Sequence, residues 1–336
     1  MLMLKKTIAA LSLLSILAAC QNDENPSQPE PKPRQDINLT RAEQEFMDKG
    51  TDFAFRFFDQ VCSTEKEKPN IFVSPLSASL CLSMITNGAT DNTLAEMQNV
   101  LGFPANTFSL DDLNNYNQKL TSALLDLDNT TQLGIANSIW IEEGFKVYDS
   151  FVDVNKKMYD AQVQELDFTS PTAKDMINQW CATQTNNCIK EVIQEIPADV
   201  RMYLINALYF KGIWKSQFDK SATGQDNFTN VDGSQQKVAM MNQTATFNYT
   251  QTDDFSIAEL PYGNEAFSMV ILLPSGDKTL DESLPSLNYE NWKQWSKNMV
   301  GKELQIKLPR FKVEYDKELE EDMIAMGMKD AFDAYK

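Results

Sequence analysis

The side chains that most often carry enzyme chemistry are either missing from this sequence or form no recognisable pattern. Its 336 residues include no histidine, so neither a Ser-His-Asp nor a Cys-His nucleophile can be assembled, and histidine-containing metal sites are excluded. The 12 glycines never occur as Gly-x-Gly, which excludes phosphate-binding loops of that type. Pairs of carboxylates could be drawn almost anywhere among 48 Asp and Glu residues, and solvated faces explain them better. We therefore expect no enzyme, no catalytic residue, no metal and no cofactor.

Cysteine chemistry is the next candidate, and the number and spacing of the cysteines argue against a disulfide framework. The cysteines are Cys20, Cys62, Cys81, Cys181 and Cys188. The four after Cys20 are too few to hold together a domain of this size. Cys81 falls in an apolar helical pattern and is predicted to be a buried free thiol. Cys181 and Cys188 would be about 10 Å apart on a continuous helix, so a disulfide could join them only if the helix ends near Asn186.

Residues 1–20 have the pattern of a lipoprotein signal peptide. Lys5 and Lys6 precede an apolar stretch, residues 8–19, that is too short to span a bilayer. The segment ends in LAAC, which resembles a lipobox, the motif whose cysteine becomes the lipidated first residue of a bacterial lipoprotein. We predict that Cys20 is lipidated. The alternative is a lone apolar cysteine in an ordinary signal peptide.

Residues 21–41 are predicted to be a tether between this anchor and a folded domain. Prolines at positions 26, 29, 31 and 33 stand among polar residues, a composition that cannot bury a core and favours an extended spacer. The letters QNDE after Cys20 weakly resemble a surface-export signal of some Gram-negative lipoproteins. We expect an outer-membrane lipoprotein exposed at the cell surface, with a periplasm-facing arrangement as the alternative.

The overall charge limits the partners. Thirty Lys and Arg residues against 48 Asp and Glu residues give a net charge of −18. Binding to nucleic acid would need a local basic patch, and the sequence contains none, so we expect no nucleic-acid partner. Anionic lipids also repel an acidic body, so contact with a membrane depends on the predicted anchor at Cys20.

Hydrophobic periodicity predicts a single α+β domain over residues 42–336. Apolar residues at helical spacing predict helices over residues 46–61, 76–88, 110–127 and 319–326, and another around 177–180. Ser74 is placed to cap the second helix and Pro75 to begin it. Residues 133–141 and 200–210 are apolar on both faces, as the central strands of a covered sheet are. Helices first and mainly strands afterwards are typical of an α+β domain.

Three local features are also predicted. Thr93 and Glu96 have the spacing of a capping box at the start of a helix. Residues 71–73 have the composition of a short buried strand. Residues 255–274 are expected to form two strands joined by a turn at 262–264.

Two segments carry a family resemblance: NALYFKGIWKSQFDKSAT at residues 206–223 and NIFVSPLSASLCLSMITNGAT at residues 70–90. They resemble the third strand of the large sheet and the buried second helix of serpins, the serine-protease-inhibitor fold. The segments AMMNQTATFNY, AELPYGNEAFSMVILLPSG, LPRFKVEYDKELEEDMIAMGM and KDAF resemble the family in the same order. Because the match is collinear over residues 45–336, the chain is identified as a member of the serpin family. The resemblance implies helices packed on a large, mostly antiparallel sheet, with smaller sheets beside it.

The resemblance implies an inhibitor that acts mechanically. In serpins the target protease cleaves an exposed reactive loop, which inserts as a new strand into the large sheet and drags the acyl-enzyme with it. Insertion pairs backbone groups and buries apolar side chains, releasing stored strain. The implied partners are serine proteases, with cysteine proteases as a further class, and the implied state is a monomer.

The resemblance places a conformational switch, the family's shutter, beneath the sheet at Ser74, Pro75, Ser77 and Asn206. Such a switch needs small polar groups whose hydrogen bonds can be exchanged as strands part. From the residues alone, Ser74 is as well explained by helix capping and Asn206 by a satisfied position in the core.

A second switch region, the family's breach at the top of the sheet where insertion starts, is implied at Gly212 and Trp214. Gly212 resembles the turn glycine that precedes the tryptophan of this region. A large core residue is the simpler interpretation of Trp214, and it is compatible with the implied role.

The resemblance also implies that the sequence is a truncated record of a longer protein, with a genuinely short chain as the alternative. After residues 329–332 the family continues through a further strand of the large sheet, a small-residue hinge, the reactive loop with its reactive-site bond, and more strands. The family's shutter histidine lies in that part, which agrees with the absence of histidine here. Without it, the strand at 304–308 is expected to lose its neighbour, while the alternation that resumes at 311–315 after Pro309 predicts a further strand segment.

Two other functions remain open on the sequence: a non-inhibitory serpin-fold protein that binds a partner at the surface, and an inactive fragment. Small residues in the hinge would permit insertion, whereas proline or bulky charged residues would oppose it. The hinge lies beyond Lys336, so these residues select neither the function nor the target protease.

Overall fold

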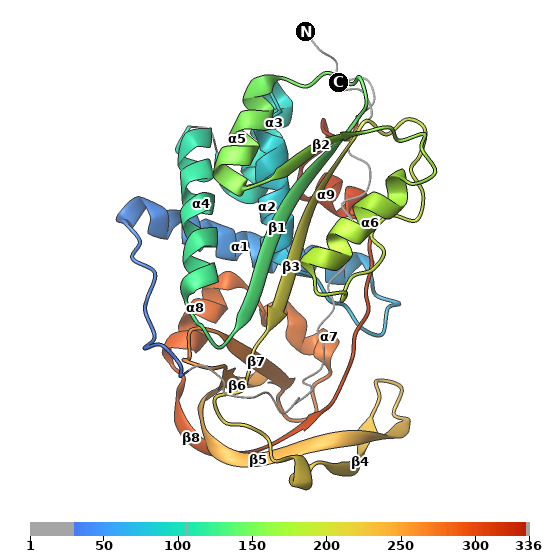
Figure 1. Cartoon of the computed structure of the whole chain (residues 1–336). Coiled ribbons are helices and arrows are strands. Elements are labelled where there is room, and N and C mark those ends of the chain that lie inside the picture. Colours follow the sequence, from blue (N-terminus) through green and yellow to red (C-terminus); the bar gives the residue numbers. More distant parts are fainter. Residues whose placement is uncertain (1–29, 105, 334–336) are drawn as a thin grey trace.

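The computed structural model describes residues 30–104 and 106–333, so the signal segment and Cys20 lie outside the described residues (Figure 1). The helices are α1 (Arg41–Thr64), α2 (Pro75–Thr86), α3 (Asp91–Leu101), α4 (Leu110–Asp126), α5 (Asp149–Tyr159), α6 (Ala173–Gln184), α7 (Leu280–Ser283), α8 (Tyr289–Lys297) and α9 (Glu320–Met326), with short 3-10 turns η1 (Lys220–Ala222) and η2 (Leu284–Ser286). The strands are β1 (Gln132–Glu142), β2 (Gln162–Leu166), β3 (Met202–Lys211), β4 (Gly224–Thr229), β5 (Gln235–Gln251), β6 (Phe255–Pro261), β7 (Ser268–Pro274) and β8 (Val300–Pro309).

The N-terminal helices form where the sequence predicts them, for local reasons. Thr40 and Glu43 make a reciprocal capping box at the start of α1. Ser74 caps α2, where its hydroxyl accepts a hydrogen bond from the backbone N–H of Ser77, and Pro75 fills the first helical position. The apolar face of α1 lies in a core shared with α2, α3, α4 and α9.

Two local predictions in this region are wrong. The helix α3 starts at Asp91, after Thr90, so Thr93 and Glu96 form no capping box; the carboxylate of Glu96 instead accepts hydrogen bonds from Asn92 and from the backbone N–H of Asp330. Residues 71–73 form no strand. Their apolar side chains pack against the first core, and that burial accounts for the composition that suggested a strand.

The first sheet has the strand order β2-β1-β3. β1 pairs antiparallel with β3 over ten positions and parallel with β2 over five. Figure 1 shows α6 on one face of this sheet and α2 and α5 on the other, which confirms that β1 and β3 are covered strands. The resemblance expects this sheet to be the large one, yet it has three strands in the described part of the chain. Within that part, β3 pairs with a strand on one side only.

The second sheet has the order β4-β5-β6-β7, with β8 paired to β5. The turn at residues 262–264 joins β6 and β7, as predicted. The expectation that residues 304–308 lose their neighbour is wrong, because β8 pairs with β5 over ten positions. The prediction of a strand at 311–315 is also wrong, since only Val313 there makes an isolated bridge. Alternation of side chains can indicate a strand, but a ladder also needs a neighbouring strand.

None of the helices in the described ranges is long and apolar enough to cross a membrane.

Candidate functional site

The predicted shutter residues on α2 form one polar pair. The hydroxyl of Ser74 donates to Oγ of Ser77 over 3.1 Å, and the side chain of Ser77 is buried. Pro75 lies between them at the first helical position, where its missing N–H costs no hydrogen bond. The capping role that the sequence offered as an alternative is thus present, and it does not conflict with a role in a switch.

Asn206 makes its hydrogen bond along the sheet. Its Nδ2 donates to Oδ1 of Asn137, the residue directly opposite on β1, over 2.8 Å. Its own Oδ1 is buried and has no hydrogen-bond partner. A buried polar atom without a partner costs about 1–3 kcal/mol, so Asn206 is not the satisfied core residue that the sequence allowed.

The structure brings the two halves of the shutter to the same face of the sheet but does not bond them to each other. Asn206 is two residues after Leu204 on β3, so both side chains point to the same face, and Leu204 packs in the core that includes Leu80 and Met84 of α2. The Cys81 thiol of α2 contacts the carbonyl of Leu204 at 3.9 Å. The hydrogen bonds of the described residues nevertheless keep Ser74 and Ser77 as one pair and Asn206 and Asn137 as another.

A buried chain of polar side chains continues from this pair, and sequence reasoning did not find it. Asn137 donates to the carbonyl of Tyr159 over 2.7 Å, and the Tyr159 hydroxyl donates to Asn114 over 2.7 Å. Asn114 in turn donates to Asn87, just past α2, over 2.8 Å. Burial raises the pKa of Tyr159 to about 12, so its hydroxyl keeps its proton. The only signal in the sequence was a pair of polar residues, Asn137 and Ser138, inside a mainly apolar strand.

The predicted breach residues lie together at the end of β3. Trp214 stacks on Tyr262 with ring centroids 4.3 Å apart and makes an isolated bridge with it. A Cβ added to Gly212 would come within 2.7 Å of the Tyr262 ring, so the close approach requires glycine. Tyr262 was predicted only as part of a turn, because its contact with Trp214 spans 48 residues of sequence and leaves no local pattern.

Trp214 shares a feature with Asn206. Its side chain is buried, and its Nε1–H has no hydrogen-bond partner. Buried indole N–H groups usually find an acceptor. Each predicted switch region therefore contains a buried polar atom that no described residue satisfies. Asn206 lies on β3, whose outer side has no described neighbour, and Trp214 lies three residues past its end.

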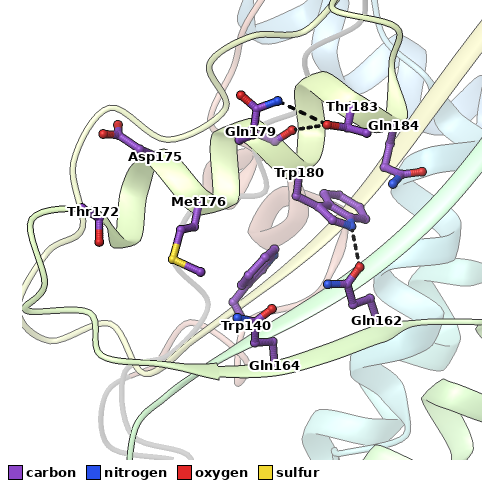
Figure 2. A pocket seen from close by; sticks show the side chains of 10 residues that line it. All are labelled: Trp140, Gln162, Gln164, Thr172, Asp175, Met176, Gln179, Trp180, Thr183 and Gln184. Atoms are coloured by element: carbon purple, nitrogen blue, oxygen red, sulfur yellow. Dashed lines mark hydrogen bonds between the residues drawn. The ribbon is translucent and has the colours of Figure 1, made fainter.

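An open groove of about 580 Å³ lies between α6 and the first sheet (Figure 2). Trp140 of β1 and Trp180 of α6 meet edge to face beside it, and Gln162 of β2 accepts the indole hydrogen bond of Trp180 over 3.1 Å. The groove lining contains amides, hydroxyls and a single carboxylate, that of Asp175, and no group that could act as a nucleophile–base pair.

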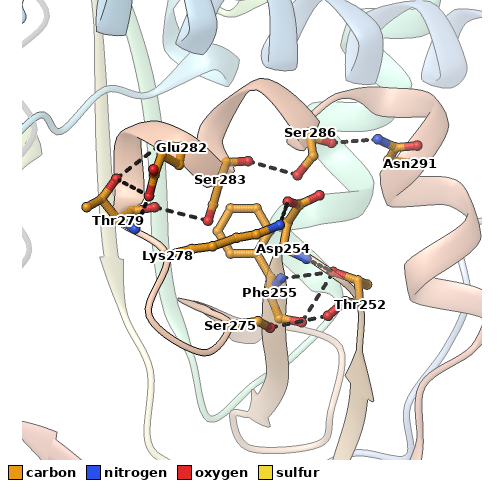
Figure 3. A network of polar contacts seen from close by, with 10 residues as sticks. All are labelled: Thr252, Asp254, Phe255, Ser275, Lys278, Thr279, Glu282, Ser283, Ser286 and Asn291. Carbon is orange, nitrogen blue, oxygen red and sulfur yellow. Dashed lines mark hydrogen bonds and ion pairs between the residues drawn. The ribbon is translucent and has the colours of Figure 1, made fainter.

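A second polar cluster, at the base of β6 and β7, is structural (Figure 3). Lys278 pairs with Asp254 over 2.7 Å, and Thr252 accepts hydrogen bonds from the backbone of Asp254 and Phe255. Thr279 caps the short helix α7. These contacts satisfy turn and helix-end groups, so the cluster positions the hairpin and offers no site.

The four described cysteines are free. The helix α6 ends at Gln184, near the point that a disulfide between Cys181 and Cys188 would require, but no bond joins them. Burial raises the pKa of Cys81 to about 12, which keeps this thiol protonated and unreactive. No group of three or more Cys, Asp or Glu side chains that could hold a metal occurs among the described residues.

Comparisons with known proteins agree with this geometry. A family model described as "Serpin (serine protease inhibitor)" matches residues 48–336. An uncharacterized serpin-like protein of Methanosarcina acetivorans is 33% identical over 287 residues, covering 83% of this chain and 66% of its own length. Human Serpin B3 is 31% identical over 302 residues, covering 84% and 77%. The chain thus spans about two thirds to three quarters of the length of these relatives. The native-state crystal structure of Tengpin, a thermophilic serpin, superposes with a TM-score of 0.78 at 30% identity, covering 90% of this chain and 76% of that one.

Proposed function

The chain belongs to the serpin family, and from this premise we propose that the protein inhibits serine proteases by inserting a cleaved reactive loop as a strand beside β3. In the family resemblance this loop follows the part that residues 329–332 match. Cysteine proteases form a second target class, and the active form is a monomer.

The observation that carries this proposal is the coincidence of three features on β3. Its outer side has no strand neighbour among the described residues. Oδ1 of Asn206 beneath it and Nε1 of Trp214 at its end are both buried without partners. Unpartnered atoms also occur elsewhere in the described residues, such as Tyr315 Oη and, on β5, Gln243 Nε2. The support for the proposal is therefore the coincidence of Asn206 and Trp214 with the outer side of β3.

A strand that enters beside β3 would satisfy groups that now lack partners. Its backbone would pair with the outer N–H and C=O groups of β3, each pair contributing about 0.5–1.5 kcal/mol. The separation of the two polar pairs at Ser74 and Asn206 supports a role in opening, because the pairs can part without breaking a bond between them.

The test is to incubate the protein, as its gene encodes it, with proteases that cleave after basic, aromatic or small residues. An inhibitor of this type forms a covalent complex that survives boiling in SDS, and inhibition approaches one molecule of inhibitor per protease. Cleavage by every protease without a stable complex would reject inhibition. It would favour the alternative of a non-inhibitory binding protein or an inactive fragment.

We further propose that the protein is an outer-membrane lipoprotein exposed at the cell surface and anchored through lipidated Cys20. The support is the sequence of residues 1–20, which lies outside the described residues. Mass spectrometry of the mature N-terminus tests it. A diacylglyceryl cysteine at position 20 is the expected result, and an N-terminus elsewhere or an unmodified Cys20 would contradict it. Protection of the protein from protease added to whole cells would indicate the periplasm-facing arrangement.

A further inference from the structure

Residues 30–36, which we call the strap, lie against the folded domain. They contact two segments far away in the sequence: the turn at residues 126–131, called the Asp128 turn, and the loop at residues 262–266, called the hairpin loop. In Figure 1 this part of the chain runs from beside the second sheet up to the start of α1. Leu39 then packs against the first core and Thr40 caps α1, which fixes the far end.

Asn129 of the Asp128 turn holds the strap by its backbone. Its Nδ2 donates to the carbonyl of Glu30 over 3.0 Å, and its Oδ1 accepts from the N–H of Lys32 over 2.8 Å. The Asn129 side chain thus bonds one C=O and one N–H of the strap, as a residue of a neighbouring strand would do with its backbone. Pro31 lies between the two bonded residues, where its missing N–H costs nothing and its fixed φ favours the extended chain.

Arg34 joins the strap to the hairpin loop. Its guanidinium donates to the carbonyl of Glu265 over 3.1 Å. Glu265 has a φ of +74°, a conformation that non-glycine residues adopt only when their surroundings hold them there. The side chain of Glu265 pairs with Lys215, the residue after Trp214.

The hairpin loop is in turn bonded to the end of β3. Gly263 donates its N–H to the carbonyl of Ile213 over 2.8 Å, and Lys215 donates to the carbonyl of Pro261 over 2.9 Å. Tyr262 stacks on Trp214. A continuous set of contacts therefore runs from the strap through the hairpin loop to the breach.

Ion pairs contribute little to this attachment. Lys32 pairs with Asp126 over 3.3 Å, but both side chains are largely exposed, and exposed pairs are weak and screened by salt. The hydrogen bonds at Asn129 and the bond from Arg34 to a carbonyl, which are also exposed, carry the contact.

We propose that the strap is a latch that keeps the breach closed. While it is bound, it restrains the hairpin loop and so the stacking of Tyr262 on Trp214. When it is released, whether by tension on the N-terminal tether or by proteolysis within it, the end of β3 opens more readily. This inference rests on the proposed function in one respect: opening at this end is where an incoming strand would enter.

The experiment is hydrogen exchange on the protein as its gene encodes it, followed at the backbone N–H groups of Gly263 and Lys215. Asn129→Ala should speed exchange at both by about fivefold, because two hydrogen bonds of the latch are lost. Asn129→Asp keeps the acceptor for Lys32 and should give a smaller increase. Asp126→Asn removes only the exposed ion pair and should change exchange less than about twofold.

Because Asn129 belongs to the Asp128 turn, a second variant separates the latch from the turn. Replacing residues 30–36 with seven Gly and Ser residues leaves Asn129 in place and should reproduce the faster exchange at Gly263 and Lys215. Unchanged exchange at these two sites in the strap variant would overturn the proposal, even if Asn129→Ala alters it. This test uses no protease, so its failure is distinct from a failure to inhibit. If the protein inhibits no protease but exchange becomes faster in the variants, the latch is supported and the proposed function is rejected.

Discussion

Strand β3 and the Asp128 turn differ in how their buried polar groups are satisfied. On β3 and just past its end, Oδ1 of Asn206 and Nε1 of Trp214 lack partners. In the turn, the buried carboxylate of Asp128 accepts hydrogen bonds from the backbone and hydroxyl of Thr130, the hydroxyl of Thr131 and the N–H of Asn264. The two regions are connected through the hairpin loop. We expect the Asp128 turn, whose hydrogen bonds are satisfied, to be the more rigid of the two, and the end of β3 to rearrange more readily.

The hairpin loop is held to the turn by shape as well as by hydrogen bonds. A Cβ on Gly263 would lie 2.1 Å from the hydroxyl of Thr130, and its φ of +36° also favours glycine. Asn264 donates to the carbonyl of Leu127 over 2.7 Å. These contacts hold Gly263 and Asn264 against the Asp128 turn, while Tyr262 of the same loop stacks on Trp214.

The largest expected effect is at the secured end. Asp128→Asn should lower the free energy of unfolding by about 3 kcal/mol, because an amide offers donors where several donors already converge. Urea denaturation measures it, with Asp126→Asn, which is exposed, as the matched control at less than about 0.5 kcal/mol. Equal effects at both positions would mean that the carboxylate of Asp128 does not secure the turn.

The same carboxylate predicts a pH dependence. Burial raises the pKa of Asp128, but the hydrogen bonds from Thr130, Thr131 and Asn264 outweigh burial and hold the pKa below its ordinary value. Its contribution to stability is therefore present above about pH 3.9, the usual aspartate pKa, and is lost as the pH falls through the lower folded pKa. Acid titrations of the parent and of Asp128→Asn should differ in that window, and parallel curves would contradict the assignment.

On β1, Asn137→Ala should cost about 2 kcal/mol. The change leaves two groups without their partner: Nδ2 of Asn206, which is partly buried, and the buried carbonyl of Tyr159. Denaturation with urea again gives the value. A loss below about 0.5 kcal/mol would show that the polar chain under the sheet is not closely packed.

At the end of β3, Gly212→Ala should destabilise by about 1.5 kcal/mol, because the added methyl group meets the Tyr262 ring. Trp214 fluorescence should shift as the stacked ring moves. Gly224→Ala is the control, since a Cβ there meets nothing within 4 Å. Similar losses in both variants would argue against close packing at the breach.

The smallest effect is expected at Asn206 itself. Asn206→Ala leaves Oδ1 of Asn137 without a donor but also removes the unpartnered Oδ1 of Asn206, so the net change should be below about 1 kcal/mol. The two residues share one hydrogen bond, yet the loss of unfolding free energy should be about twofold or more larger for Asn137→Ala than for Asn206→Ala. Equal costs would mean that Asn206 is an ordinary satisfied core residue.

Features that depend on neighbouring residues could be predicted from the sequence, whereas contacts between distant segments could not. Ser74 and Pro75 cap and begin α2 through interactions within one turn, and the periodicity of α1 depends on its own face. Asn137, Tyr159 and Tyr262 escaped prediction because each acquires its role from a partner at least 22 residues away. The strap was predicted only as a spacer, since nothing in its composition indicates Asn129 or Glu265. The false strand at 311–315 shows the same limit, because alternation describes a strand's faces but not its neighbours.

The most direct measurement of the central claim is hydrogen exchange along β3 before and after reaction with a serine protease, on the protein as its gene encodes it. If a loop inserts beside β3, the β3 amides that β1 leaves unpaired should become protected by about two orders of magnitude or more. Cleavage of the protein with unchanged exchange along β3 would contradict strand insertion at this edge.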